Sequence, residues 1–113
     1  MTFSIAARCV DTGMFGIAVS SSSPAVAARC AHARAGIGAF GTQNITDPRL
    51  GPQGLDLMAK GASAEQAIAS LRQSAPHIAF RQLIAVDAKG GTAAHSGVHT
   101  LRTHATAQAF DVG

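Results

Sequence analysis

The order of its patterned segments constrains this chain most, because strand-like segments lie on both sides of two helix-like segments. The runs Thr2–Arg8 and Met14–Ser20 are rich in apolar residues. The turn sequence Asp11-Thr12-Gly13 between them predicts an antiparallel hairpin. The second run is apolar almost throughout, so we expect both of its faces to be buried.

Glycine marks the next strand-like segment, Gly36–Gln43, in which glycines alternate with apolar residues. Several glycines in one strand predict that a neighbouring layer or a ligand packs close to the backbone. A polar break at Ser20–Ser23 and Pro24 precedes this strand. The segment Ala25–Ala33 fits either a strand or a helical turn.

Two helices are predicted in the middle of the chain. Pro52 suits the first turn of a helix that continues to about Lys60, and Gly61 suits its C-terminal stop. Ser63 and Gln66 form a capping-box sequence that starts the second helix, which ends before Pro76. The apolar positions of this second helix are spaced to lie on one face: Ala64, Ala67, Ile68 and Leu71.

Strand patterns return in the C-terminal part. Gln82–Asp87 is the clearest strand, Ala88–Gly91 is a turn, and Thr92–Ser96 is the expected hairpin partner. Thr100–Ala109 alternates weakly, as a last strand would. Strands, two helices and strands in this order predict an α+β fold, in which antiparallel sheet packs on helices.

The composition predicts a protein that contacts other chains. Apolar residues make up 47% of the 113 residues and charged residues only 13%. Little charge is therefore available to cover the surface, and we expect an oligomer. The net charge of +3 comes from nine scattered Lys and Arg against six Asp and Glu, which argues against nucleic-acid binding.

Cysteine and histidine patterns give no sign of a metal site. Cys9 and Cys30 are far apart, as expected for free thiols in a reducing cytoplasm. His95 and His99 are four residues apart but not in a helical context, so we expect no metal and no cofactor. No signal peptide or membrane-spanning run is present in the sequence, so we expect a soluble cytoplasmic protein without membrane association.

Segments along nearly the whole chain, taken in order, carry a resemblance: Thr2–Arg8, Gly16–Ser20, Pro24–Val26, Ala33–Ala39, Thr42-Gln43, Asp47-Pro48, Gly51–Leu55 and Arg81–Asp87. Together they resemble a bacterial family catalogued as domain of unknown function one thousand and twenty-eight, of the N-terminal-nucleophile (Ntn) hydrolase-like superfamily. The resemblance implies a four-layer αββα sandwich, two helical layers enclosing two stacked antiparallel sheets, of which this chain supplies the N-terminal part. Family members are longer, and Asn is more usual where this chain has Asp47.

Thr2 is the first candidate nucleophile. Bacterial methionine aminopeptidase generally removes Met1 before a small residue, which would give Thr2 a free α-amine with a pKa of about 8. That amine can take the proton of the Thr2 hydroxyl and so act as its base. Alternatively, Thr2 only opens an edge strand, or a retained Met1 blocks the amine and the nucleophile lies elsewhere.

Strand ends supply further candidates. Ser20 ends the second strand, and Thr42 and Gln43 end the glycine-rich strand, so we expect all three to face one cleft. The Thr42 hydroxyl and the carboxamides of Gln43 and Asn44 suit an oxyanion hole, with Asn44 as a substrate-binding group. Ser20 and Thr42 are also alternative nucleophiles. The alternative is that these hydroxyls only make ordinary hydrogen bonds within strands.

Arg34, or Arg8, is the candidate for binding a substrate carboxylate through a bidentate pair. The alternative for either arginine is an ordinary surface position.

The resemblance implies an amide-bond (C–N) hydrolase that acts on a small linear or cyclic amide by nucleophilic acyl transfer. Residues 1–113 then form a single domain, or the N-terminal (alpha) subunit left when a longer precursor cuts itself after Gly113. Glycine suits a scissile position because its backbone is permissive, and a second chain from the same precursor would carry a new nucleophile. The alternatives are a cloned or proteolysed fragment, and a noncatalytic binding or assembly module that kept the fold.

Overall fold

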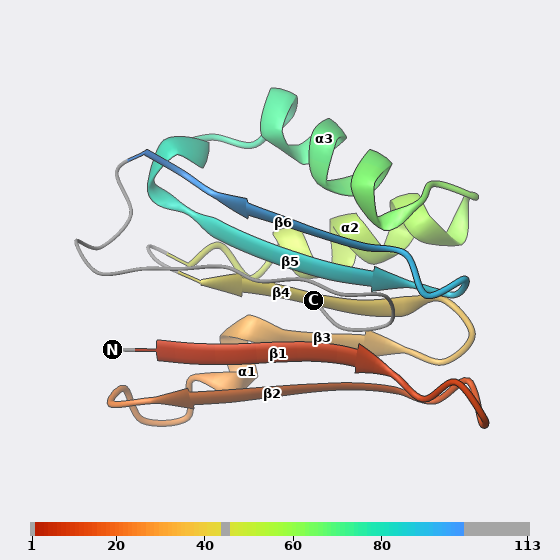
Figure 1. Cartoon of the computed structure of the whole chain (residues 1–113). Helices are drawn as coiled ribbons and strands as arrows, with labels where there is room; N and C mark the ends of the chain where they lie inside the picture. Colours follow the sequence, from red (N-terminus) through yellow and green to blue (C-terminus); the bar gives the residue numbers. More distant parts are fainter. Residues whose placement is uncertain (1, 44–45, 99–113) are drawn as a thin grey trace.

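A computed structural model, which describes residues 2–43 and 46–98, shows an α+β protein built in layers (Figure 1). Helices cover one face of a four-stranded antiparallel sheet, and a two-stranded antiparallel sheet lies against the other face. The predicted α+β class is confirmed. The predicted strand Thr100–Ala109 and the predicted cleavage position Gly113 lie outside the described residues.

The two-stranded sheet is the predicted N-terminal hairpin. Strands β1 (Thr2–Arg8) and β2 (Phe15–Ser21) pair antiparallel along their whole length. Gly13 closes the turn with a φ of +72°, a left-handed conformation that glycine adopts without steric cost. The prediction that both faces of the second strand are buried is wrong, since half-buried and exposed residues alternate along β2. Only one face of this sheet packs on the rest of the described chain, so every second side chain points to solvent.

The larger sheet contains four strands in chain order: β3 (Ala31–Arg34), β4 (Gly38–Gln43), β5 (Gln82–Asp87) and β6 (Thr92–Ser96). All neighbouring strands are antiparallel. The ambiguous segment Ala25–Ala33 contains both kinds of structure, because the short helix α1 (Ala27–Cys30) leads directly into β3. A 3-10 turn, η1 (Ile78–Phe80), precedes β5.

Gly41 of β4 lets the two sheets approach closely, as the glycine pattern predicts. A Cβ atom added there would lie 3.0 Å from the side chain of Ile17 in β2 and 2.8 Å from that of Ile84 in β5. A larger residue at this position would have to displace the side chains of Ile84 and Ile17.

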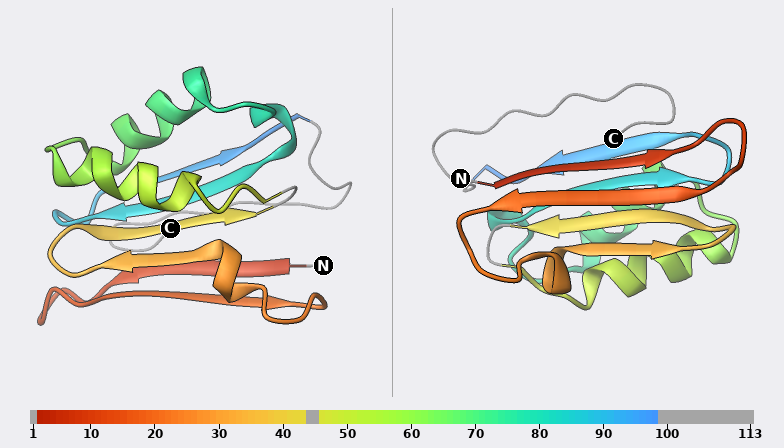
Figure 2. Two further views of the ribbon diagram at one scale, coloured as in Figure 1. Left: turned by 180° about the vertical axis from the view of Figure 1, so that it is seen from behind. Right: turned by 90° about the horizontal axis from the view of Figure 1, so that it is seen from below.

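Helices α2 (Leu50–Ala59) and α3 (Ala64–Ser74) lie on the same face of the larger sheet (Figure 2). Helix α2 begins before Pro52, which occupies its first turn, where the missing N–H is not needed. The capping box of α3 is confirmed: Ser63 Oγ accepts the Gln66 N–H at 3.1 Å, and Gln66 Oε1 accepts the Ser63 N–H at 2.9 Å. No helix in the described part of the chain is long and apolar enough to cross a membrane.

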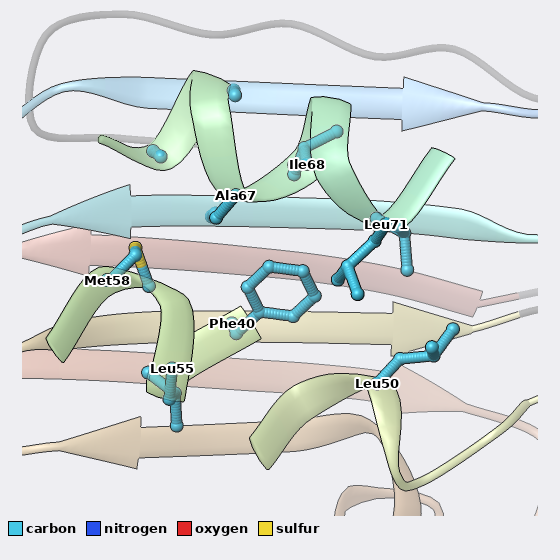
Figure 3. Packing of buried hydrophobic residues seen from close by; sticks show 11 residues of the cluster. Phe40, Leu50, Leu55, Met58, Ala67, Ile68 and Leu71 are labelled. Atoms are coloured by element: carbon cyan, nitrogen blue, oxygen red, sulfur yellow. The ribbon is translucent and has the colours of Figure 1, made fainter. Parts of the chain in front are cut away.

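Alternation of side chains along β4 divides the core into two clusters. Phe40 points toward the helices and packs with Leu50 and Leu71 (Figure 3). Ala39 points the other way and packs with Ala6 of the hairpin. Because successive strand residues point to opposite faces, odd-numbered residues of β4 face the hairpin and even-numbered residues face the helices.

Candidate functional site

Hydroxyl and carboxamide side chains gather at one end of the space between the two sheets. They occupy the inward-facing positions where β2, β4 and β6 end and where β1 and β5 begin. Each of them is half-buried. We call this set the inter-sheet polar cluster, and its members are Thr2, Ser4, Ser21, Gln43, Gln82 and Ser96.

Alternation along the strands explains why the cluster forms. In β1, Thr2 and Ser4 share a face with Ala6, which is fully buried between the sheets. In β4, Gln43 shares a face with Ala39. The register places Gln43 opposite Gln82 and Gln82 opposite Ser96, so these three form one row across the larger sheet.

Three hydrogen bonds join the six members of the cluster in pairs. Thr2 Oγ1 and Ser21 Oγ lie 2.9 Å apart in the hairpin. Gln82 Nε2 donates to Ser96 Oγ at 3.2 Å within the larger sheet. Gln43 Nε2 donates to Ser4 Oγ at 3.2 Å, and this bond joins the two sheets.

Gln43 Oε1 is buried and, within the described structure, has no hydrogen-bond partner. Its own Nε2 donates to Ser4 Oγ, so Oε1 is the open atom of the carboxamide. A buried acceptor without a donor costs roughly 1–3 kcal/mol. The cluster therefore contains one unpaired acceptor that a donor from a bound molecule could satisfy.

The side chains of the cluster are uncharged, because all six members are Thr, Ser or Gln. A charged group placed among them would find no side chain of opposite charge within the cluster. Burying an unpaired charge is costly, whereas neutral donors and acceptors can be satisfied by hydrogen bonds alone. The side chains of the cluster therefore offer hydroxyl groups and neutral hydrogen bonding.

The sequence-predicted residues do not all meet at one cleft. Thr42 is adjacent to Gln43 but points toward the helices, where it is 1% exposed and its Oγ1 has no partner among the described residues. Ser20 is exposed on the outer face of the hairpin, opposite Phe3. The expectation that Ser20, Thr42 and Gln43 share one cleft is corrected, because adjacent strand residues face opposite sides.

Arg34 lies at the opposite end of the larger sheet. It pairs with Gly38, and Gly38 is about 17 Å from Gln43 along β4 at about 3.3 Å per residue. Arg34 NH1 donates to Asp56 Oδ1 of α2 at 2.8 Å, and the two side chains are 41% and 62% exposed. Asn44 lies outside the described residues.

A groove of about 630 Å³ opens at the Arg34 end of the molecule. It lies between the hairpin turn and the β3–β4 turn. Its lining residues are Thr12, Gly13, Met14, Phe15, Ala33, Arg34, Ala35, Gly36 and Ala88. The groove is therefore remote from the inter-sheet polar cluster.

Sequence reasoning missed four members of the cluster: Ser4, Ser21, Gln82 and Ser96. One signal for them was present in the sequence. In each of these strands, a polar residue near the strand end lies two positions from an apolar residue, so both point to the same face of the sheet. Combining them required the register between strands and the stacking of the sheets, which local patterns do not provide. Among residues 2–43 and 46–98, no group of three metal-ligating side chains is present.

Comparison with known proteins supports a family assignment. The model of a family of unknown function, DUF1028, matches residues 2–112. A crystal structure of a DUF1028 protein from Silicibacter pomeroyi superimposes with a TM-score of 0.93 at 25% sequence identity, covering 98% of this chain and 52% of that one. The chain thus spans about half the length of that protein, and no curated protein matches it. On the family-model match over almost its whole length, this chain belongs to the DUF1028 family.

Proposed function

We propose that this chain is the N-terminal part of an amide-bond hydrolase that acts on a small neutral amide, with Thr2 as its nucleophile. The observation that carries the proposal is the position of the Thr2 hydroxyl. It stands at the start of β1, faces the space between the sheets, and is 2.9 Å from the Ser21 hydroxyl in a neutral, half-buried cluster.

The proposed chemistry starts with removal of Met1, which frees the Thr2 α-amine. The amine takes the proton of Thr2 Oγ1 while that oxygen attacks the carbonyl carbon of the substrate amide. The Ser21 hydroxyl, and the Ser4 hydroxyl whose oxygen accepts from Gln43 Nε2, can donate to the resulting oxyanion. The C–N bond breaks as the amine returns the proton to the leaving nitrogen, and water then hydrolyses the ester on Thr2.

The complete fold is proposed to be an Ntn-hydrolase-like αββα sandwich, with a further helical layer over the hairpin. Phe3 and Ile5 on the outer face of β1 are 65% and 48% exposed. Their neighbours on that face are small and uncharged: Ala7, Gly16, Ala18 and Ser20. Exposed apolar surface of this kind favours an interface. The remaining part of a protein as long as the Silicibacter pomeroyi relative is the proposed occupant.

Self-cleavage after Gly113 is a second proposed route to a nucleophile. It would place the new N-terminal residue on a second chain and leave Thr2 as a hydrogen-bonding residue. Intact-mass measurement of a longer precursor distinguishes the two routes, since Thr2 chemistry requires only the loss of Met1.

Substitution of Thr2 tests the proposal. In protein whose intact mass shows Thr2 as the first residue, Thr2→Ala is expected to reduce hydrolysis of small linear amides and lactams by about a thousandfold or more. Thr2→Ser should retain measurable turnover because it keeps the hydroxyl. The matched control is Thr12→Ala in the hairpin turn, remote from the cluster.

Full activity of Thr2→Ala, or of protein that keeps Met1, would exclude Thr2 as the nucleophile. Absence of turnover across the amide panel would favour the noncatalytic binding or assembly module instead.

A further inference from the structure

We infer that Gln43 is a specificity-determining residue that selects ligands with a neutral N–H donor, such as the –NH₂ of a primary carboxamide or ureido group. The inference deepens the proposed function and rests on it for the identification of the cluster as a substrate site. It concerns what the site binds rather than which residue attacks.

The first step is the hydrogen bond of the Gln43 side chain. Gln43 ends β4, and its Nε2 donates to Ser4 Oγ of β1 at 3.2 Å. This bond joins two different sheets and uses the nitrogen of the carboxamide. In this orientation the oxygen Oε1 is the atom left open.

The second step is the unused acceptor. Gln43 Oε1 is buried and has no donor among the described residues. A ligand that supplies an N–H or O–H satisfies it and recovers the cost of the unpaired oxygen. A ligand without a donor leaves it unpaired, which is the situation in which protein sites discriminate most strongly.

The third step is the choice among donors. A carboxylate has no N–H and would place its oxygens against Gln43 Oε1. An ammonium group has donors, but the Thr, Ser and Gln side chains of the cluster provide no negative charge to compensate it. A neutral –NH₂ therefore fits better than either charged group.

The position of Gln43 also suits a small substrate. Its partner Ser4 lies two residues along β1 from Thr2 on the same face, a separation of about 7 Å. A small molecule can therefore present an N–H to Gln43 Oε1 and a carbonyl to Thr2 at the same time.

The test is a titration of the full 113-residue chain with three matched probes: propionamide, propionate and propylammonium. Backbone amide shifts of Ser4, Gln43 and Gln82 in two-dimensional NMR spectra report binding. Saturable shifts are expected with propionamide and not with the two charged probes. Gln43→Met, which keeps the side-chain length, should weaken propionamide binding about tenfold, as expected for loss of one hydrogen bond.

A second variant keeps the test valid if Gln43→Met unfolds the chain. Gln43→Glu introduces a negative charge at the same place and should reverse the preference, so that propylammonium binds at least about tenfold more tightly than propionamide. The matched control is Gln73→Met on the exposed surface of α3, which should leave all shifts unchanged.

Three outcomes would overturn the inference: no saturable shift with propionamide, equal binding of propionate, or an unchanged preference in Gln43→Glu. Failure of the proposed function is separate. If Thr2→Ala keeps full turnover while Gln43→Met loses propionamide binding, the nucleophile is wrong and the specificity role stands. If Thr2→Ala loses turnover and Gln43→Met binds normally, the specificity role is wrong.

Discussion

Asp47 is a buried carboxylate held by a single exposed arginine two residues further along the chain. The carboxylate is 7% exposed and accepts from the Arg49 backbone N–H at 3.0 Å, from Nε at 2.9 Å and from NH2 at 2.8 Å. The hydrogen bonds from the Arg49 side chain lower the pKa of Asp47 to about 2, and the positive charge of Arg81 acts in the same direction. This turn immediately precedes α2, so Asp47 stabilises the entry to the helix.

The lowered pKa of Asp47 predicts a defined loss of stability at acid pH. Because the pKa of Asp47 is lower in the folded chain than the 3.8 of the unfolded chain, ionised Asp47 stabilises the fold. This stabilisation is fully present well above pH 3.8 and is lost as the pH falls toward about 2. At pH 7, Asp47→Asn is expected to lower the free energy of unfolding by about 1–2 kcal/mol, and this difference should vanish between pH 4 and pH 2. Urea denaturation at several pH values measures it, with exposed Asp11→Asn as control. A difference independent of pH would contradict the role of this carboxylate.

Residue types at the site could be predicted from the sequence, but side-chain directions only in part. Thr2, Thr42 and Gln43 could be predicted as candidate site residues because they carry hydroxyl or amide groups at strand ends. Once the bounds of a strand are known, the alternation of its side chains gives the face to which each residue points. This alternation places Thr42 and Gln43 on opposite faces of the sheet. The contact between Gln43 and Ser4 depends on how the sheets stack, which no local pattern specifies.

At the scale of elements, glycine sets how closely α2 packs on the sheet. A Cβ atom added to Gly54 would lie 2.4 Å from Cε2 of Phe40, which is fully buried beneath the helix (Figure 3). Gly51, one turn earlier, meets the ring of His32 in the same way. Helix α2 therefore rests directly on side chains of β3 and β4, and its glycines are needed for packing rather than for backbone flexibility.

Substitution of Gly54 tests this packing by the sign of its effect. In an exposed helix interior, Gly→Ala stabilises by up to about 1 kcal/mol. At Gly54, the clash with the Phe40 ring should reverse the sign and lower the free energy of unfolding by about 1–3 kcal/mol. Gly16→Ala is the control, because no atom lies within 4 Å of a Cβ there, and it should be neutral or slightly stabilising. A stabilising Gly54→Ala would show that α2 is not in close contact with Phe40.

At the scale of the whole molecule, the order of elements was predictable and the layering was not. Periodicity and capping located the hairpin, both long helices and the β5–β6 pair. The glycine pattern of β4 indicated a close neighbour but could not say that the neighbour is the N-terminal hairpin. Long-range stacking of this kind depends on contacts between segments far apart in the sequence. One result is that Phe3 and Ile5 on the outer face of the hairpin are exposed in this chain.

The outer face of the hairpin should be dispensable for folding of this chain and needed for association. Phe3 and Ile5 point away from the inter-sheet core, so the double variant Phe3→Thr, Ile5→Thr should change the free energy of unfolding by no more than about 1 kcal/mol. It should also reduce binding of a hydrophobic fluorescent dye and concentration-dependent association in sedimentation experiments.

The inward pair Ile17→Thr, Val19→Thr is the control. These half-buried side chains face the larger sheet, so their loss should lower the free energy of unfolding by several times as much. Equal destabilisation by both double variants would mean that the outer face is already buried in the isolated chain. Retained association after the outer-face change would mean that the interface does not depend on Phe3 and Ile5.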